Sequence, residues 1–198
     1  MKKKFLLSLS VLFILVACEP TFTPKPRGYN HIDLPEHEYV KWLDTTKPYS
    51  FEIFKGGIVK PYVTELVKEE QDWVIIDYPE LQSSLWVTYY DLHNSIDTLN
   101  KNIATSFKLT DKHNVKATGM DSEVLSQEKG KYAVGVTIEG EVPSQYQFFL
   151  HDSTSNFLRV ALYFNTSRKN DSLAPVIDYM KEDMMHIIKT VEWKEDVQ

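Results

Sequence analysis

The first eighteen residues constrain this chain most, because they decide which part of it has to fold. Lys2, Lys3 and Lys4 precede an uncharged, largely apolar run from Phe5 to Val16. Positive charges followed by such a run are typical of an export signal, and the run is too short to span a bilayer as a helix. The sequence therefore predicts that residues 1–17 are a signal peptide, removed before the rest of the chain folds.

Cys18 is the only cysteine in the chain, and it follows directly on Leu15, Val16 and Ala17. The pattern resembles the lipobox, in which the cysteine receives a diacylglycerol before the signal is cleaved. The alternative, a free thiol in a core, fits poorly because a polar, proline-rich segment follows. We expect Cys18 to be the lipid attachment site, and we expect a fold without internal disulfides. Two or three acyl chains give lasting membrane attachment.

The charge balance argues against nucleic acid as a partner. Loss of the three signal lysines takes the basic residues from 22 to 19 against 28 acidic residues, so the exported chain has a formal net charge of −9. An acidic surface without a basic stripe cannot release phosphate counterions, and anionic lipid headgroups repel it mildly. The lipid therefore has to hold the protein at the membrane.

A polar tether precedes the part that folds. Residues 18–28 contain Pro20, Pro24 and Pro26 with few apolar side chains, which is typical of an extended, polyproline-like spacer. The sequence thus predicts three parts: a signal peptide at 1–17, a lipidated tether at 18–28, and a single globular domain at 29–198.

Period-two alternation and β-branched or aromatic residues predict a series of short strands in the folded part. The later strands are joined by connections of hairpin length. The predicted strands cover residues 29–34, 39–42, 49–54, 73–78, 85–90, 132–141, 145–151 and 157–164.

Two helices are predicted with these strands. The first helix is predicted at residues 94–112, where apolar side chains recur at steps of three and four. Asn94 or Ser95 can cap its first turn. A longer helix at 172–193 has one apolar stripe, and 170–172 supply capping oxygens. The order of elements predicts an α+β domain, with an antiparallel sheet packed against helices on one face and a long C-terminal helix.

Several short motifs stand in a distinctive order after the cysteine. They are Pro24-Lys25-Pro26-Arg27-Gly28-Tyr29, Ile32-Asp33-Leu34-Pro35, Glu38-Tyr39, Pro48-Tyr49, Phe157-Leu158-Arg159, Ala161-Leu162-Tyr163-Phe164-Asn165, Asn170-Asp171-Ser172-Leu173-Ala174-Pro175-Val176 and Glu192-Trp193. Their order and spacing resemble the gliding motility lipoprotein GldD family over nearly the whole chain.

This resemblance implies a role in the cell-envelope machinery of gliding bacteria and in the associated type IX secretion pathway. Other envelope proteins of that machinery would be the partners, and no reaction comes with the resemblance. The carboxyl half is also similar to the layout of the PsbP and Mog1 proteins, an antiparallel sheet packed between helices. Glu19 follows Cys18 without a cluster of acidic residues, which favours an outer-membrane position facing the periplasm.

Residues of catalytic type do not converge in the sequence. His151-Asp152-Ser153 contains the residue types of a hydrolase triad, but neighbours on a strand point to opposite faces, so a loop is the better interpretation. Asp183 and His186 lie one turn apart on the predicted last helix, as a metal-binding pair would, although chance explains such spacing well. We expect no enzyme activity, no cofactor, no metal and no small-molecule substrate.

One candidate partner-binding segment lies in the tether. Its residues are Pro24, Lys25, Pro26, Arg27, Gly28 and Tyr29. A preformed extended peptide loses little entropy when it docks in a groove, whereas a solvated spacer needs no partner at all. Both interpretations stay open, and the resemblance favours docking.

A second candidate surface lies on the predicted strand at 85–90. Alternation places Trp86 and Tyr90 on one face and Val87 and Tyr89 on the other, so one face is expected to be buried and the other partly wet. Core packing and stacking on a sugar or peptide both explain these aromatic residues. The sequence therefore predicts a lipid-anchored envelope protein that acts by protein–protein interaction, with a periplasmic glycan- or peptidoglycan-binding or hydrolytic domain as the alternative.

Overall fold

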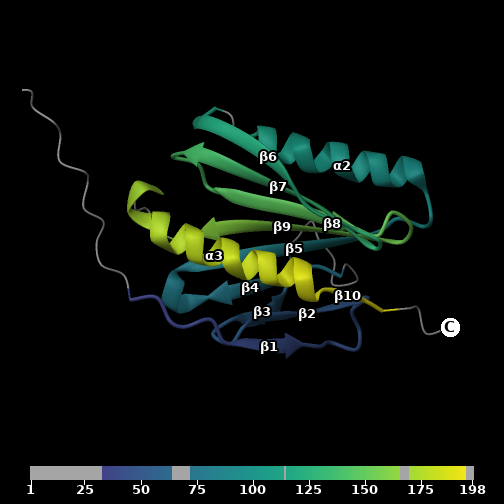
Figure 1. The fold of residues 1–198 in the computed structure, drawn as a ribbon, viewed down its shortest axis with the longest axis horizontal. Helices are drawn as coiled ribbons and strands as arrows, with labels where there is room; N and C mark the ends of the chain where they lie inside the picture. Colours follow the sequence, from purple (N-terminus) through teal and green to yellow (C-terminus); the bar gives the residue numbers. More distant parts are fainter. Residues whose placement is uncertain (1–32, 64–71, 114, 166–169, 195–198) are drawn as a thin grey trace, which may run out of the picture. The chain divides into compact units, whose positions relative to one another are not determined.

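The structure is a computed structural model that describes residues 33–63, 72–113, 115–165 and 170–194 (Figure 1). The signal peptide, Cys18 and the tether segment from Pro24 to Tyr29 lie outside the described residues, and so does most of the strand predicted at 29–34. None of the helices in the described part is both long and apolar enough to cross a membrane.

Seven antiparallel strands form the main sheet, in the order β3-β4-β5-β9-β8-β7-β6. β5 and β9 pair along nine residues each, from Ser83 opposite Phe164 to Asp91 opposite Asn156, and so join the two halves of the sheet. The strands are β3 (Ile58–Pro61), β4 (Val74–Tyr78), β5 (Ser83–Asp91), β6 (Ala117–Glu128), β7 (Lys131–Gly140), β8 (Tyr146–His151) and β9 (Asn156–Phe164).

A second sheet has three strands in the order β1-β2-β10. Their bounds are β1 (Tyr39–Trp42), β2 (Tyr49–Phe54) and β10 (Glu192–Trp193). The central strand β2 is almost entirely buried, since its side chains join the core of the main sheet.

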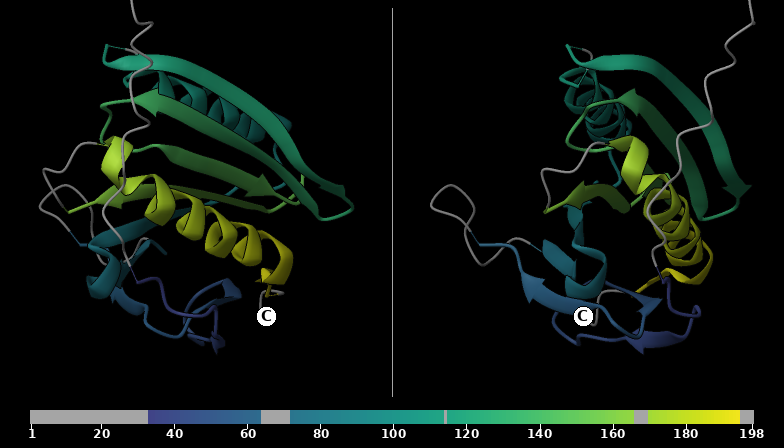
Figure 2. Two further views of the ribbon diagram at one scale, coloured as in Figure 1. Left: turned by 60° about the vertical axis from the view of Figure 1, so that its left-hand side comes forward. Right: turned by 90° about the vertical axis from the view of Figure 1, so that its left-hand side faces the viewer.

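The two long helices pack on opposite faces of the main sheet (Figures 1 and 2). Helix α3 (Asn170–Thr190) and the small sheet cover one face, and α2 (Ile96–Asp111) packs on β8 and β9 from the other. Ser95 caps α2, because its hydroxyl accepts a hydrogen bond from the backbone N–H of Thr98 (3.2 Å). A short 3-10 helix, η1 (Pro79–Leu81), links β4 to β5.

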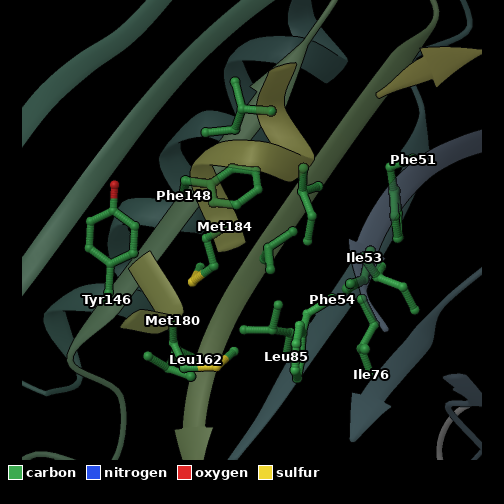
Figure 3. Packing of buried hydrophobic residues seen from close by; sticks show 14 of the residues in the cluster. Phe51, Ile53, Phe54, Ile76, Leu85, Tyr146, Phe148, Leu162, Met180 and Met184 are labelled. Carbon is green, nitrogen blue, oxygen red and sulfur yellow. The ribbon is translucent and has the colours of Figure 1, made fainter. Parts of the chain in front are cut away.

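The main core lies between the main sheet, α3 and β2. Met180 and Met184 of α3 are fully buried there, as the apolar stripe predicts. Figure 3 shows them among side chains of the main sheet that include Leu85, Phe148 and Leu162. Burying such side chains contributes about 1.5–3 kcal/mol each relative to leaving them exposed.

The α+β class with an antiparallel sheet and a long C-terminal helix is confirmed, with three differences in detail. Helices cover both faces of the main sheet and not one. The last helix ends at Thr190, because Glu192 and Trp193 pair with Ser50 and Tyr49 of β2 and so form β10. The strands β3 and β6 were not predicted, since both lie at sheet edges and consist largely of exposed residues.

Candidate functional site

Five half-buried aromatic side chains gather on the outer face of the main sheet, the face on which α2 packs mainly on β8 and β9. We call this group the aromatic face; it consists of Tyr62, Trp73, Trp86, Tyr90 and Tyr163. Trp86 and Tyr90 lie on β5 and Tyr163 on β9, while Tyr62 directly follows β3 and Trp73 directly precedes β4.

The five rings form one continuous chain of contacts. The Trp86 ring centroid lies 5.0 Å from that of Tyr163 and 5.0 Å from that of Tyr62. Tyr62 then stacks on Trp73 at 5.9 Å, and Trp73 meets Tyr90 edge-on at 5.5 Å. Offset and edge-to-face pairs at such distances stabilise one another by about 0.5–1.5 kcal/mol each. The aromatic face is therefore preorganised.

Strand alternation in β5 places these rings on the outer face. Leu85 and Val87 point to the core and are at most 1% exposed, whereas Trp86 and Tyr90 point outward and are half-buried. Tyr89 packs against the core side. The predicted division of this strand into a buried and a partly wet face is thus correct.

Hydrogen bonds hold both tryptophans in place. The Trp73 indole N–H donates to the backbone carbonyl of Tyr89 (2.8 Å), and the Trp86 indole N–H donates to the Ser84 hydroxyl (3.2 Å). Because each indole donor already has a partner, the exposed part of each ring offers an apolar surface to a partner.

Arg159 on β9 borders the aromatic face. It lies opposite Thr88 of β5, and its guanidinium donates to the side-chain carbonyl of Gln147 under α2. Burial lowers the pKa of Arg159, and the neighbouring Tyr163 and Tyr90 only partly oppose this. Sequence reasoning did not single out Arg159, although a lone arginine within an apolar strand is a usable signal.

A polar cleft of about 520 Å³ opens between the β5–α2 connection, the β8–β9 turn and β10. Its volume lies within the range of small-molecule sites. Lining side chains include Tyr89, Asp91, Asn94, Asp152, Asn156 and Trp193. The lining includes two carboxylates, Asp91 and Asp152, and a glycan hydrolase uses a pair of carboxylates.

Hydrogen bonds within the β8–β9 turn already engage one of these carboxylates. Asp152 Oδ1 accepts the backbone N–H groups of Thr154, Ser155 and Asn156 at 2.8–3.0 Å, and Oδ2 accepts the Asn156 amide (2.6 Å). Burial alone raises the pKa of Asp152, but these hydrogen bonds outweigh it and lower the pKa. Asp152 therefore stays ionised and stabilises the turn, which is the opposite of a general acid.

The His151-Asp152-Ser153 sequence forms this same turn. The Ser153 hydroxyl lies 3.3 Å from Nδ1 of His151, the last residue of β8, but the Asp152 carboxylate points to backbone N–H groups instead. The acid that would orient the histidine of a triad is thus engaged elsewhere, and the loop interpretation agrees with the geometry.

A buried polar cluster fastens the segment before β1 to α3. Asp183 is 1% exposed, and its Oδ1 lies 2.8 Å from His37 Nδ1 and 3.1 Å from the Tyr39 hydroxyl, which donates to it. The His37 ring stacks on Tyr179 (4.0 Å), and Tyr39 stacks on His186 (3.5 Å). The rings therefore fill the space around the carboxylate.

Burial raises the pKa of Asp183, because desolvation outweighs the hydrogen bond and charge of His37. Burial likewise raises the pKa of the Tyr179 phenol to about 12. His186 does not share a ligand position with Asp183, since its Nε2 lies 2.7 Å from Glu52 Oε2. Within the described ranges no three His, Cys, Asp or Glu side chains are placed to hold a metal ion.

Comparison with known proteins identifies a family and finds similarity to a solved structure. No match was found among curated proteins. The solution structure of cyanobacterial PsbP (CyanoP) from Synechocystis sp. PCC 6803 is similar with a TM-score of 0.48 and 12% identity, over 86% of this chain and 99% of that chain. Residues 19–193 match the family described as gliding motility lipoprotein GldD. A match over this much of the sequence shows that the chain belongs to the gliding motility lipoprotein GldD family.

Proposed function

We propose that this lipoprotein acts in the gliding and type IX secretion machinery by binding other envelope proteins through its aromatic face. Membership of a gliding motility lipoprotein family supports the setting. The binding role rests on one observation, the chain of five half-buried rings on the outer face of the main sheet. A continuous group of apolar side chains that a fold leaves partly uncovered is a candidate interaction site.

The composition of this surface fits a protein partner. Tryptophan, tyrosine and arginine dominate the energetics of protein interfaces, and all three residue types occur together here, with Arg159 beside Trp86 and Tyr90. The rings are held in place before binding, so a partner loses less of the binding free energy to ordering them.

The anchor and tether complete the proposal. Lipid on Cys18 would confine the domain to the outer membrane facing the periplasm, and the segment Pro24 to Tyr29 would add a second, extended contact. Confinement to a membrane raises the effective concentration of two proteins that share it, so weak contacts suffice. Both parts rest on the sequence patterns alone.

The decisive experiment compares, in the native host, a half-buried position of the aromatic face with an exposed position elsewhere. Trp86→Ala removes the central ring of the aromatic face, while Leu43→Ala removes a 59% exposed apolar side chain elsewhere. We expect Trp86→Ala to abolish gliding and to reduce type IX secretion at normal protein level, and Leu43→Ala to change neither. A photocrosslinking residue should trap an envelope protein from position 86 and not from position 43.

Two outcomes would contradict the proposal. Normal gliding with Trp86→Ala at normal protein level would remove the aromatic face from the function. Normal gliding and secretion with Cys18→Ala, and also with deletion of 24–29, would remove the anchor and the tether.

A second candidate function is non-catalytic binding of a saccharide, which the polar cleft favours. Asp91 and Asn94 provide hydrogen-bonding groups at its wall, and Trp193 provides a ring. Titration of the full-length protein with chitotriose, followed by tryptophan fluorescence, should show saturable binding that Asp91→Ala abolishes. A flat titration to millimolar sugar would rule out this class of ligand.

A further inference from the structure

Arg159 is a half-buried cation whose neighbours among the described residues include no carboxylate; they include His113, whose pKa burial and the charge of Arg159 lower. Its guanidinium bonds to Gln147 and lies near Tyr163 and Tyr90. None of the described carboxylates forms an ion pair with it. Removing a charged group from water without a counter-ion is unfavourable, which is why buried charges are normally paired.

The counter-ion cannot enter from the inner side of Arg159. The cavity there, lined by Ser106, Thr110, Gln147 and Arg159 among others, has a volume of only about 10 Å³. That is room for about one water molecule and not for a carboxylate. On its other side Arg159 borders the aromatic face, because it lies opposite Thr88 of β5 and close to Tyr90 and Tyr163.

The neighbouring rings would strengthen an ion pair formed at this place. A partner that covers the aromatic face excludes water from it, and the attraction between two charges rises as the local dielectric constant falls. A guanidinium presents two parallel N–H groups to a carboxylate, so the pair also fixes the orientation of the partner.

We propose that the aromatic face recognises an extended segment of a partner protein that presents a glutamate or aspartate carboxylate to Arg159, with aromatic or proline residues of that segment lying on Trp86 and Tyr90. This inference rests on the proposed function and specifies the chemistry of the partner. A membrane surface is the less favoured anion, because the net charge of the exported chain is −9 and a single arginine does not form a basic patch.

The test uses peptide selection on the full-length, lipidated protein in nanodiscs of neutral lipid. A phage library of random ten-residue peptides is the probe, and Arg159→Gln and Trp86→Ala are selected in parallel. We expect the wild type to enrich peptides with an acidic residue next to aromatic or proline residues. Arg159→Gln should keep the aromatic and proline preference and lose the acidic one, while Trp86→Ala should enrich nothing.

Synthetic peptides then complete a double-mutant cycle. Replacing the acidic residue of the selected peptide by its amide should weaken binding to the wild type at least tenfold and leave binding to Arg159→Gln unchanged. If Arg159→Gln does not fold, Arg159→Lys replaces it. Lysine keeps the charge but not the two parallel N–H groups, so replacing the acidic residue of the peptide by its amide should weaken binding to this variant only a few times.

The possible failures are distinct. The wild type could select peptides that Trp86→Ala does not select and that contain no acidic residue. In that case the proposed function stands, and the proposal of a carboxylate that binds Arg159 is wrong. If the wild type selects no peptide, both proposals fail. Arg159-dependent binding of the wild type to phosphatidylglycerol vesicles, without acidic peptides, would replace the protein partner by a lipid phosphate.

Discussion

The two faces of the main sheet differ although the same strands form both. Along β5, the inward Leu85 and Val87 are covered completely, while the outward Trp86 and Tyr90 stay half-buried. The inner face is closed by α3 and β2, whereas α2 covers only part of the outer face. Period-two alternation therefore separates two roles, since packing against the inner face stabilises the fold and the uncovered part of the outer face remains open to a partner.

The largest expected effect is loss of a core side chain on the inner face. Met184→Ala removes a fully buried side chain and leaves a cavity, so we expect the free energy of unfolding to fall by about 3 kcal/mol. Met185→Ala, at the half-buried neighbouring position, should cost clearly less. Urea unfolding measures the free energy of unfolding of both variants, provided that its dependence on urea concentration is unchanged. Equal losses of stability in the two variants would contradict the contrast between these positions.

The next largest effect concerns the β8–β9 turn, whose strands contribute to both faces. Asp152→Ala removes four hydrogen bonds to a carboxylate, so we expect a loss of about 2 kcal/mol at pH 7. The pKa of Asp152 is lowered by folding, so its stabilisation is present above the ordinary value of 3.8 and disappears as the pH falls through the folded-state value. The difference between wild type and variant should therefore shrink on acidification, and a pH-independent difference would refute this role.

A smaller effect, with the opposite dependence on pH, is expected at Asp183 on the inner face. Because burial raises its pKa, the folded state holds its proton longer than the unfolded state. Its contribution to stability is thus complete below the ordinary value of 3.8 and is lost as the pH rises through the raised value. Asp183→Asn cannot lose a proton, so its free energy of unfolding should rise relative to that of the wild type as the pH increases from 4 to 7.

The exposed Asp178 on the same helix provides the matched control for Asp183. Asp178→Asn should give an unfolding free energy parallel to that of the wild type across this pH range. If Asp183→Asn also ran parallel to the wild type, the buried carboxylate would not be the group that titrates.

The smallest effect is expected at the rim of the outer face. Lys60 lies 2.9 Å from Asp77, and both side chains are partly exposed. Exposed ion pairs contribute little, so Lys60→Ala should change the free energy of unfolding by no more than about 0.5 kcal/mol. Lys60→Ala should also leave gliding intact, as expected if the functional surface consists of the rings and Arg159. A gliding defect would show that the functional surface extends to the rim.

Sequence patterns predicted those parts of the fold that local periodicity encodes. Strong alternation located β2, β5, β8 and β9, and the apolar stripe with Met180 and Met184 located α3. The edge strand β6 carries little local signal, because its pairing with β7 and not its own burial forms the strand. β10 depends likewise on the neighbouring β2.

The candidate sites were predicted only in part, for a related reason. The outward position of Trp86 and Tyr90 follows from alternation within one strand. The isolation of Arg159 depends on which side chains from other strands surround it. The contact between His37 and Asp183 joins residues 146 positions apart, a separation at which spacing carries no information.

The sequence by itself determined the α+β class, the alternation that separates an inner from an outer face, and the family, because these depend on local patterns and on the order of motifs. Tertiary structure alone decided which face is closed, which arginine has no carboxylate partner among the described residues and which carboxylates are engaged. Those properties depend on atoms brought together by packing from distant parts of the chain, and burial of charge and of hydrogen-bonding groups is a property of the assembled surroundings and not of a residue.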